Sequence, residues 1–531
     1  MLLHSLKKRC LKKLASAQAL TSGMGSVAIA TVLSCFASPA DAVNLTFVPD
    51  DLVVSRSVYQ GKANTVTVGQ TLPGGGTATN NGLYPNVFNN EKVDASFGVT
   101  SPIFLDQITT SGQNAGTVSI DPTIITTSFP SKSELSLNLT ADGTGLTFMG
   151  YSTGINQLDV SNSNTPGIIE PGNPVTTTPT YRAVGQLNYD NSLQVTTTNS
   201  YPGNNGRAAI LAPNGVYYTV GNGGNGNGST AVTNATGVQI VNPRQNATPT
   251  SPTIPVGQYN ITQNGYPADK TAKDNNFRGE TIYNNTLYTT KGSGSNGINS
   301  VYQVGNAGTL PNPANAASTP ISILPGFNTT LARNPLPGVQ NNPFGLFFAN
   351  PNTLYVTDEG NDATTAAGGI ASTNVYGGLQ KWSLVNGTWV QDYVLTNGLQ
   401  LGSNYTAVDP VTGNTYNTAT EGLRNLTGKV NSDGTVSLYA VTSTISNATD
   451  QGADPNKLVA ITDNLLNTTA ALAATEQFNV IDNAKYGEVL RGVSFAPNSK
   501  PVPEPVTILG SVIAMGIGGV MKKKYARKVE V

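Results

Sequence analysis

The sequence predicts an all-β fold, and within that class a six-bladed β-propeller closed by strands from both ends of the chain. Three observations support this prediction. The 531-residue chain holds 57 glycines and only 11% charged residues, a composition that suits short strands joined by polar turns. A hairpin pattern recurs along the chain. The last copy of that pattern is incomplete, and candidate strands near the start of the chain can complete it.

The first 42 residues have the features of a secretory signal peptide. Five basic residues lie between positions 7 and 13, an apolar stretch with small residues runs to Phe36, and Ala40-Asp41-Ala42 offers a small-x-small cleavage site. This order of parts predicts export by the Sec machinery and removal of residues 1–42. An alternative is a lipobox at residues 32–35, which would leave Cys35 lipidated.

Removal of that segment limits the chemistry available to the rest of the chain. The only histidine is His4, and the only cysteines are Cys10 and Cys35. A body beginning at Val43 therefore cannot hold a Ser-His-Asp triad, a cysteine nucleophile, a thiolate or imidazole zinc site, or a disulfide. Carboxylate, amide, hydroxyl, Lys and Arg groups remain, and they favour a binding protein over an enzyme.

The charge of the body argues against nucleic acid as a partner. Five Lys and Arg residues lie in each terminal segment, together with three acidic residues in all, which leaves 19 basic and 27 acidic residues in the body, residues 43–500, a net charge of −8. Nucleic-acid-binding proteins need a basic surface to neutralise phosphates.

Five segments share the hairpin pattern of a short strand, a tight turn and a second apolar strand. Asn-Gly and Asp-Gly turns, which tolerate positive φ, predict hairpins at these places. The expected first strands are 135–139, 207–211, 278–283, 344–348 and 424–430, and the second strands are 146–149, 216–220, 286–288, 354–356 and 436–439.

The spacing of the pattern predicts four-stranded propeller blades with long loops. The units begin at Glu134, Arg207, Arg278, Phe344, Arg424 and Arg491, at intervals of 66 to 80 residues. A repeat of that length holds about four strands. Third and fourth strands are expected at 379–384 and 388–394, and at 457–461 and 476–481.

The sixth unit decides the predicted architecture. Only one strand, 491–495, precedes the C-terminal segment, and one strand cannot form a blade. The strands expected at 52–59, 103–108 and 117–120 can supply the others, which closes the ring and protects its edges. Seven blades, or two β-sandwich domains, are the alternatives.

The long connections between second and third strands are expected on one face, opposite the tight turns. They cover residues 59–102, 152–181, 221–236, 291–300, 357–378 and 442–456. A rigid scaffold that gathers variable loops on one rim is suited to binding. Each single loop could also be Gly- and Asn-rich filler.

Four arginines are expected to ring the channel mouth. Arg207, Arg278, Arg424 and Arg491 occupy equivalent positions at the start of the innermost strands. Guanidinium groups in a ring could capture a carboxylate or phosphate in bidentate fashion. Acidic residues precede three of them at close spacing, as in Glu421-Gly-Leu-Arg424. The alternative is therefore a set of structural ion pairs that pin each blade to its neighbour.

Two acidic loops are candidates for a hard cation. Asp358 and Asp362 lie in one long loop, and Asp450 and Asp454 lie in another. Ca²⁺ prefers several oxygen ligands with a glycine that permits the turn. Neither loop matches the EF-hand pattern, and solvated carboxylates are the alternative. No cofactor other than Ca²⁺ is expected.

The last 31 residues carry a membrane-insertion pattern. Pro503-Glu504-Pro505 precedes an uncharged apolar run from Val506 to Met521, and Lys522-Lys523-Lys524 follows. Such a run predicts a short transmembrane helix, with the lysines holding the C-terminus in the cytoplasm. An ordinary C-terminal anchor is the alternative.

This tail, residues 501–531, resembles the PEP-CTERM sorting signal of bacterial envelope proteins. The resemblance covers Pro503, Glu504 and Pro505, the Gly-rich apolar run and the basic end, about 30 residues in all. It implies that exosortase, a membrane transpeptidase, recognises Pro-Glu-Pro, removes the helix and releases the body from transient inner-membrane anchoring to the cell surface or medium. The lysine-rich basic end departs from the compact arginine cluster common in the family.

Three functions fit these features. The first is an exported envelope or matrix protein whose loop face binds a glycan or another surface component. The second is a Ca²⁺-dependent propeller hydrolase of the lactonase or phosphatase type, an argument from fold alone. The third is a purely structural envelope protein. The sequence favours the first.

Overall fold

The computed structural model describes residues 45–501, except 61–65, 74–75, 85–97, 172, 174–177, 225–228, 245–249, 258–268, 271–272, 335–340, 366–369 and 447–450. The expected signal peptide and the tail with Pro503, Glu504 and Pro505 lie outside the described residues. No helix among the described residues combines the length and apolar character needed to cross a bilayer.

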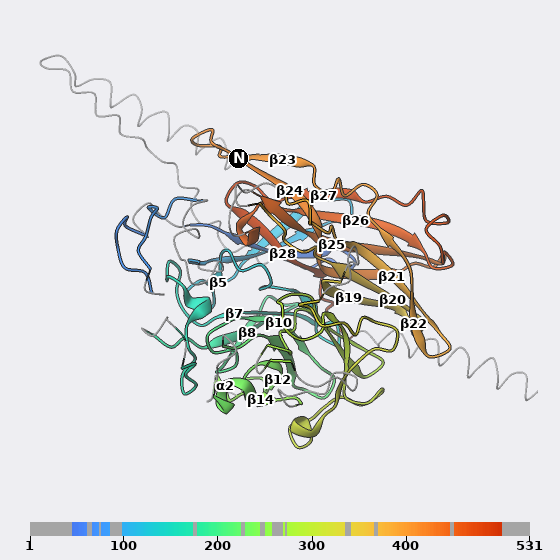
Figure 1. Ribbon diagram of the computed structural model, residues 1–531, viewed down its shortest axis with the longest axis horizontal. Helices are drawn as coiled ribbons and strands as arrows, with labels where there is room; N and C mark the ends of the chain where they lie inside the picture. The colour runs from blue at the N-terminus through green and yellow to red at the C-terminus, as the bar shows by residue number, and fades with distance from the viewer. Residues whose placement is uncertain are drawn as a thin grey trace, which may run out of the picture. The chain divides into compact units, whose positions relative to one another are not determined.

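Six sheets of four or five strands form the blades of a β-propeller (Figure 1). The innermost strand of each blade contacts the innermost strands of its two neighbours, and that of the sixth blade contacts that of the first, so the ring is closed. In ring order they are β28 (Glu488–Phe495), β6 (Asn138–Leu139), β10 (Gly206–Leu211), β15 (Glu280–Tyr283), β19 (Pro343–Asn350) and β24 (Thr415–Val430).

We number the blades 1 to 6 in that order and give the remaining strands outward from the axis. Blade 1 continues with β1 (Leu52–Val58), β3 (Ile103–Ile108) and β4 (Asn114–Ser119). Blade 2 continues with β7 (Gly145–Tyr151), β8 (Arg182–Asn188), β9 (Leu193–Thr198) and, parallel to β9, β13 (Thr250–Ser251). Blade 3 continues with β11 (Tyr217–Gly221), β12 (Gly237–Val241) and β14 (Ile254–Pro255).

Blade 4 continues with β16 (Thr286–Lys291), β17 (Ser300–Val304) and β18 (Ile321–Ile323). Blade 5 continues with β20 (Thr353–Asp358), β21 (Gly378–Val385) and β22 (Thr388–Leu395). Blade 6 continues with β25 (Thr435–Ser446), β26 (Lys457–Asn464) and β27 (Asn479–Asn483), and β23 (Asn404–Val408) pairs with the first part of β24. Outside the blades lie the β2 (Thr100–Ser101) and β5 (Thr127–Ser128) pair and the one-turn helix α2 (Thr230–Asn234).

The predicted closure of the ring is confirmed. Strand β1 pairs antiparallel with β28 from Leu52 opposite Phe495 to Val58 opposite Glu488. Strand β1 also pairs with β3, and β3 pairs with β4, so blade 1 is built from both ends of the body. Six blades in one ring mean that the seven-bladed and two-sandwich alternatives are wrong.

The predicted hairpins are present, with local differences in their extent. Strand β6 covers only Asn138–Leu139, and Leu135, the first residue of the expected strand, has a φ of 60°, outside the extended conformation that a ladder requires. Strand β24 is longer than predicted, at 16 residues, because its first part pairs with β23, which sequence reasoning missed. The turn at Asn284-Asn285 has φ of 48° and 54°, as a tight hairpin turn demands.

Neighbouring blades are joined by hydroxyl groups on their second strands. Ser55 Oγ donates to the Leu135 carbonyl at 2.7 Å, Thr147 Oγ1 to the Ala209 carbonyl at 2.6 Å, and Thr290 Oγ1 to the Phe344 carbonyl at 2.7 Å. Thr357 Oγ1 donates to the Arg424 carbonyl in the same way. Each bond ties the second strand of one blade to the backbone of the innermost segment of the next blade.

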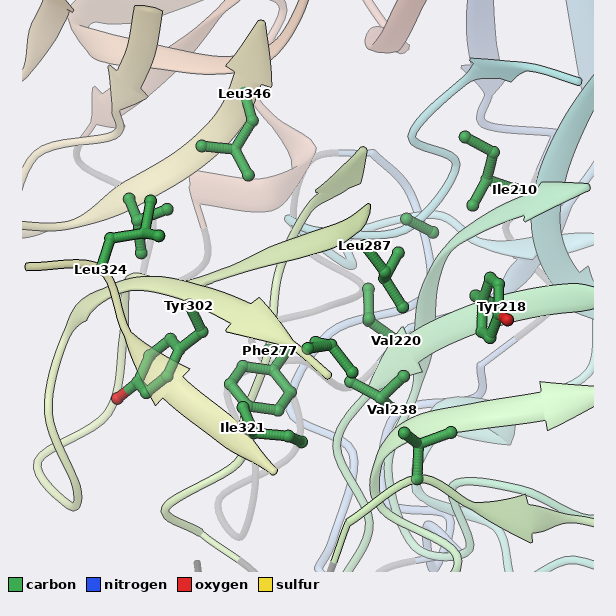
Figure 2. Close-up of a cluster of buried hydrophobic side chains, with 14 of the residues drawn as sticks. Ile210, Tyr218, Val220, Val238, Phe277, Leu287, Tyr302, Ile321, Leu324 and Leu346 are labelled. Carbon is green, nitrogen blue, oxygen red and sulfur yellow. The ribbon is translucent and has the colours of Figure 1, made fainter. Parts of the chain in front are cut away.

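Apolar side chains fill the space between blades, as Figure 2 shows for blades 3, 4 and 5. Ile210, Tyr218 and Val220 from blade 3 lie in the same cluster as Leu287 and other side chains of blade 4. Ile210, Tyr218, Val220 and Leu287 come from strands, and neighbouring connections add further apolar side chains to the cluster. Burial of this apolar surface holds adjacent blades together.

Gly492 provides a test of how closely blade 1 approaches blade 2. A methyl group at this position would lie 2.5 Å from both the Leu135 carbonyl oxygen and the Leu137 amide nitrogen, which are backbone atoms. We predict that Gly492→Ala lowers the free energy of unfolding by about 1–3 kcal/mol, the usual cost of overpacking, as measured by urea denaturation.

Gly154→Ala is the matched control, because a methyl group at Gly154 would have no atom within 4 Å. Its free energy of unfolding should stay within about 0.5 kcal/mol of the parent protein. Equal denaturation midpoints for the two variants would contradict the close approach of blades 1 and 2.

Candidate functional site

The long connections meet on one face of the propeller. Each blade is antiparallel from its first to its third strand, so the end of the second strand lies at the same face as the start of the innermost strand. The loops contact one another there. Tyr84 Oη, from the blade 1 loop, donates to the Ala453 carbonyl in the blade 6 loop at 2.8 Å. We call this surface the loop face.

Aromatic side chains stiffen the loop face between blades 1 and 6, a feature that sequence reasoning missed. The Tyr84 ring lies 4.7 to 5.9 Å, centroid to centroid, from the rings of Tyr59, Phe129, Tyr416 and Tyr486. These rings come from the connection after β1, from the segment after β5, from the start of β24 and from the segment before β28. Tilted and edge-on contacts of this kind stabilise their packing. We call these five residues the aromatic cluster.

The four predicted arginines lie at the axis, at the start of the innermost strands. Arg207, Arg278, Arg424 and Arg491 are buried, with 4 to 8% of each residue exposed. The equivalent positions of blades 2 and 5 hold Glu134 and Phe344 instead. The ring is therefore four guanidiniums interrupted by a carboxylate and an apolar side chain.

Glu359 fills the gap in the ring at blade 5. Its Oε2 lies 3.0 Å from Arg424 Nε and its Oε1 lies 3.6 Å from Arg278 Nη2. Glu359 follows β20, so this one carboxylate links blades 4, 5 and 6. Sequence reasoning missed it, since nothing in the spacing of the arginines points to a loop of a different blade.

The acidic residues that precede the arginines in sequence bond elsewhere. Glu421 Oε1 accepts the Asp362 amide at 2.7 Å, and Glu488 pairs with Arg56 at 2.9 Å. Asp274 accepts the backbone amides of Asp269 and Lys270 at 2.5 and 2.8 Å. Ion pairs between blades are thus present at Glu359, which pairs with Arg278 and Arg424.

The other two ring arginines donate to oxygens that carry no formal charge. Arg207 Nη1 donates to the Phe277 carbonyl at 2.6 Å and to Asn276 Oδ1. Arg491 Nη2 donates to the Phe129 carbonyl. Burial and the neighbouring Arg278 lower the pKa of Arg207 well below its usual value, the direction expected where positive charges are poorly compensated.

Residues 131–133, which we call the axial strap, cover the ring. Ser131 Oγ accepts Asn205 Nδ2 at 2.7 Å, and Ser133 Oγ accepts Arg278 Nη1 at 2.5 Å. Lys132 Nζ lies 2.6 Å from Asp362 Oδ2. The strap leads into blade 2, and Asp362 follows β20 of blade 5, on the opposite side of the ring. The Lys132–Asp362 ion pair therefore spans the channel mouth.

Glu421 contacts this ion pair, since its carboxyl group accepts the Asp362 amide. It is fully buried, and its Oε2 has no hydrogen-bond partner. Burial and the charge of Asp362 raise the pKa of Glu421 to about 9. At Asp362 burial acts to raise the pKa, but the positive charges of Lys132 and Arg424 outweigh it, so the pKa of Asp362 is lowered. The pKa values of two adjacent carboxyl groups are thus shifted in opposite directions.

The candidate cation ligands serve mainly as hydrogen-bond acceptors. Asp358 accepts the amides of Asn342 and Gly360 at 2.8 and 3.0 Å. Asp454 accepts the hydroxyls of Tyr416, Ser446 and Thr418 at 2.5, 2.9 and 3.2 Å. Burial raises the pKa of Asp358 and of Asp454 to about 6.

Within the described part of the chain, no three His, Cys, Asp or Glu side chains are grouped so that they could share a metal ion. Asp362 is paired with Lys132, and the fourth predicted ligand, Asp450, lies outside the described residues.

No protein-family model and no curated protein matches the chain. Among solved structures it is similar to the parainfluenza virus 5 hemagglutinin-neuraminidase with the ligand DANA, at 11% identity over 77% of this chain and 86% of that chain, with a TM-score of 0.29. The ectodomain of the same viral protein matches at 10% identity over 77% and 78% of the two chains, with a TM-score of 0.31.

A third solved structure is the extracellular domain of a protein described as a one-component system of B. thetaiotaomicron. It matches at 10% identity over 80% of this chain and 62% of that chain, with a TM-score of 0.23. Likenesses this loose say nothing about function, so the function proposed below rests on the residues of this chain.

The Glu421 carboxyl predicts a pH dependence of stability. Its folded pKa is raised above its unfolded value, so its stabilising contribution is full below the unfolded pKa and is lost as pH rises toward about 9. Between pH 7 and 9 we expect the free energy of unfolding to fall by up to about 1.4 kcal/mol per pH unit from this group. Glu421→Gln, which mimics the protonated carboxyl, should flatten that decline in urea denaturation series.

Glu476→Gln is the control, because burial raises the pKa of Glu476 to about 7, which places its effect below neutral pH. It should keep the parent decline between pH 7 and 9. Lys291, whose pKa burial and Arg278 lower to about 7, acts in the opposite direction in all three proteins and cancels in the comparison. An unchanged decline in Glu421→Gln would mean that Glu421 is ionised at neutral pH.

Proposed function

We propose that this protein is an exported component of the cell envelope or extracellular matrix whose loop face binds a glycan or another surface component. The observation that carries the proposal is that loops from different blades join into one surface. The aromatic cluster ties the blade 1 and blade 6 loops, and the Lys132–Asp362 ion pair joins opposite sides of the ring. A binding surface gains affinity when its loops are held in place before the ligand arrives.

The chemistry of the loop face suits carbohydrate. Tyr59, Tyr84, Tyr416 and Tyr486 are partly exposed, so each offers part of an apolar ring, while its hydroxyl group donates within the protein and holds the ring in place. Loops rich in Asn, Thr and Ser supply hydrogen-bond donors and acceptors around them. Tyrosine beside small polar residues is the composition that adaptable binding surfaces use, because tyrosine loses little conformational entropy when it contacts a partner.

Export and sorting are part of the proposal and rest on the two terminal segments. The signal-like residues 1–42 would direct the chain to the Sec machinery, and Pro503, Glu504 and Pro505 would present it to an exosortase-type transpeptidase. The body would then leave the inner membrane for the cell surface or the medium.

We expect replacement of Pro503, Glu504 and Pro505 by alanine to leave the body in the membrane fraction of cells that contain an exosortase. The parent protein should be found at the surface or in the medium. Cell fractionation reports where the body is, and mass spectrometry of its C-terminal peptide reports whether the tail was removed. Replacement of Lys522 to Lys524 by arginine is the matched control, because it keeps the basic end. Equal release of the triple-alanine protein would show that these residues are not a sorting signal.

Glycan binding is tested on an array with the purified protein. We predict that Tyr486→Ala weakens binding to any positive glycan at least about 10-fold, about 1.4 kcal/mol, because removal of a central aromatic contact has such an effect. Tyr189→Ala is the control, because Tyr189 lies in the turn between β8 and β9 on the opposite face and is also partly exposed.

Other outcomes would favour the alternatives. An array without binding at any glycan would contradict the proposal and favour a purely structural envelope protein. Equal loss of binding in the Tyr486 and Tyr189 variants would place the ligand away from the loop face. Hydrolysis of a lactone or phosphate ester that depends on added Ca²⁺ would favour the hydrolase alternative.

A further inference from the structure

The guanidinium ring differs from a structural arginine elsewhere in the same protein. Arg182 is fully buried, and all three of its nitrogens have acceptors. Its Nε donates to the Asn204 carbonyl at 3.0 Å, its Nη1 to the Thr180 carbonyl at 2.8 Å, and its Nη2 to the Ser161 and Ser163 carbonyls at 3.0 and 2.8 Å. This chain therefore can satisfy a buried guanidinium with its own backbone.

Three ring arginines are not satisfied in this way. Arg207 Nε, Arg278 Nε and Arg424 Nη2 are buried nitrogens without a hydrogen-bond partner. Each belongs to a residue at least nine-tenths buried. A buried donor without a partner costs free energy, and the cost is greater for a charged group. Three such donors at one axis mark a place where an acceptor group fits.

The charge around the ring is also incomplete. Arg207, Arg278 and Arg424 carry three positive charges, and Glu359 is the one carboxylate in ion-pair contact with any of them among the described residues. Nearby Glu134 already accepts from the Tyr151 hydroxyl, Thr127 Oγ1 and the Ser128 amide. Asp362 forms an ion pair with Lys132. Counted over the ring and the strap, five positive charges (Arg207, Arg278, Arg424, Arg491 and Lys132) face the three carboxylates of Glu134, Glu359 and Asp362, an excess of two.

The axial strap is the part of the structure that an incoming ligand would displace. Arg278 Nη1 donates to Ser133 Oγ, which is a neutral oxygen. An anionic oxygen in its place would bind this donor more strongly. The Lys132 and Asp362 side chains of the ion pair at the strap are 23% and 34% exposed, so this ion pair faces solvent.

We propose that Arg207, Arg278 and Arg424 form a binding site for a dianionic oxyanion, and that in the proposed function it receives a phosphate ester carried by the bound glycan. Guanidinium forks match the paired oxygens of a phosphate. A phosphate ester carries about 1.5 to 2 negative charges at pH 7, which matches the excess of two positive charges. A carboxylate or sulfate ester carries one charge and matches it less well.

The test is a titration of the full chain in detergent with inorganic phosphate, followed by thermal unfolding and calorimetry. A ligand that binds only the folded state raises the unfolding temperature, and saturating phosphate should give a saturable rise of at least about 2 °C. Inorganic sulfate, itself a dianionic oxyanion, should compete with phosphate, whereas glucuronate, with one negative charge, should bind at least about 10-fold more weakly. Chloride at matched ionic strength should give no saturable rise.

Two kinds of variant connect the effect to the ring. Arg207→Lys and Arg424→Lys keep the charge and remove the fork, and each should weaken phosphate binding at least about 10-fold. Arg333→Lys is the matched control, because Arg333 pairs with Asp269 in an exposed position and lies outside the ring. Ser133→Gly removes the oxygen on Arg278 and should tighten phosphate binding several-fold.

The outcomes separate this inference from the proposed function on which it rests. Equal effects of phosphate and chloride, or unchanged binding in both ring variants and in Ser133→Gly, would overturn the phosphate site. If glycan binding persisted in those variants, the loop face would bind the glycan without the ring, and the proposed function would hold. Phosphate binding with a blank glycan array would support the site for a free phosphate and overturn the glycan proposal.

Discussion

The pairing of β1 with β28 is the constraint on which the rest of the structure depends. It joins strands more than 400 positions apart in the chain into one sheet, and it turns a row of five complete blades and two partial ones into a closed ring. An open row would expose the edge of β28 and the inner face of blade 2 to solvent. Closure instead lets Ser55, on β1, donate to the first residues of blade 2 and places Gly492 against the same backbone.

The site at the axis is a consequence of this closure. The starts of the innermost strands converge only in a closed ring, and there Arg278 and Arg424 share Glu359 while Arg207 lies near Arg278. The strap that covers them reaches from blade 2 to blade 5 and is anchored by Lys132 and Asp362. Burial at the axis then separates the pKa values of Glu421 and Asp362, because the interior compensates one negative charge and leaves no partner for a second.

The sequence predicted the features that recur in each blade and missed the side-chain interactions between blades. The strand–turn–strand pattern depends on residues that are neighbours in the sequence and recurs at a regular spacing. The hairpins, the four arginines and the shared blade could therefore be inferred from that spacing. Glu359, Lys132 and the strap could not, because each acts on a blade distant in sequence and follows no period. Glu488 illustrates the same limit: it stands three positions before Arg491, yet the strand alternation and the closure of blade 1 direct it to Arg56. Strand β23 was missed because its residues carry no hairpin turn of the repeated kind.

The closure can be measured directly by a disulfide in a chain that otherwise has no cysteine. Val53 and Ser494 lie opposite each other in the β1–β28 register, and Cys10 and Cys35 can be replaced by serine. With Val53→Cys and Ser494→Cys introduced, we predict a spontaneous disulfide, identified by mass spectrometry as a linked peptide pair, together with a higher unfolding temperature. A chain with Val53→Cys and Ser446→Cys should not form the bond. Free thiols at residues 53 and 494 in the folded, non-reduced protein would contradict the closed ring.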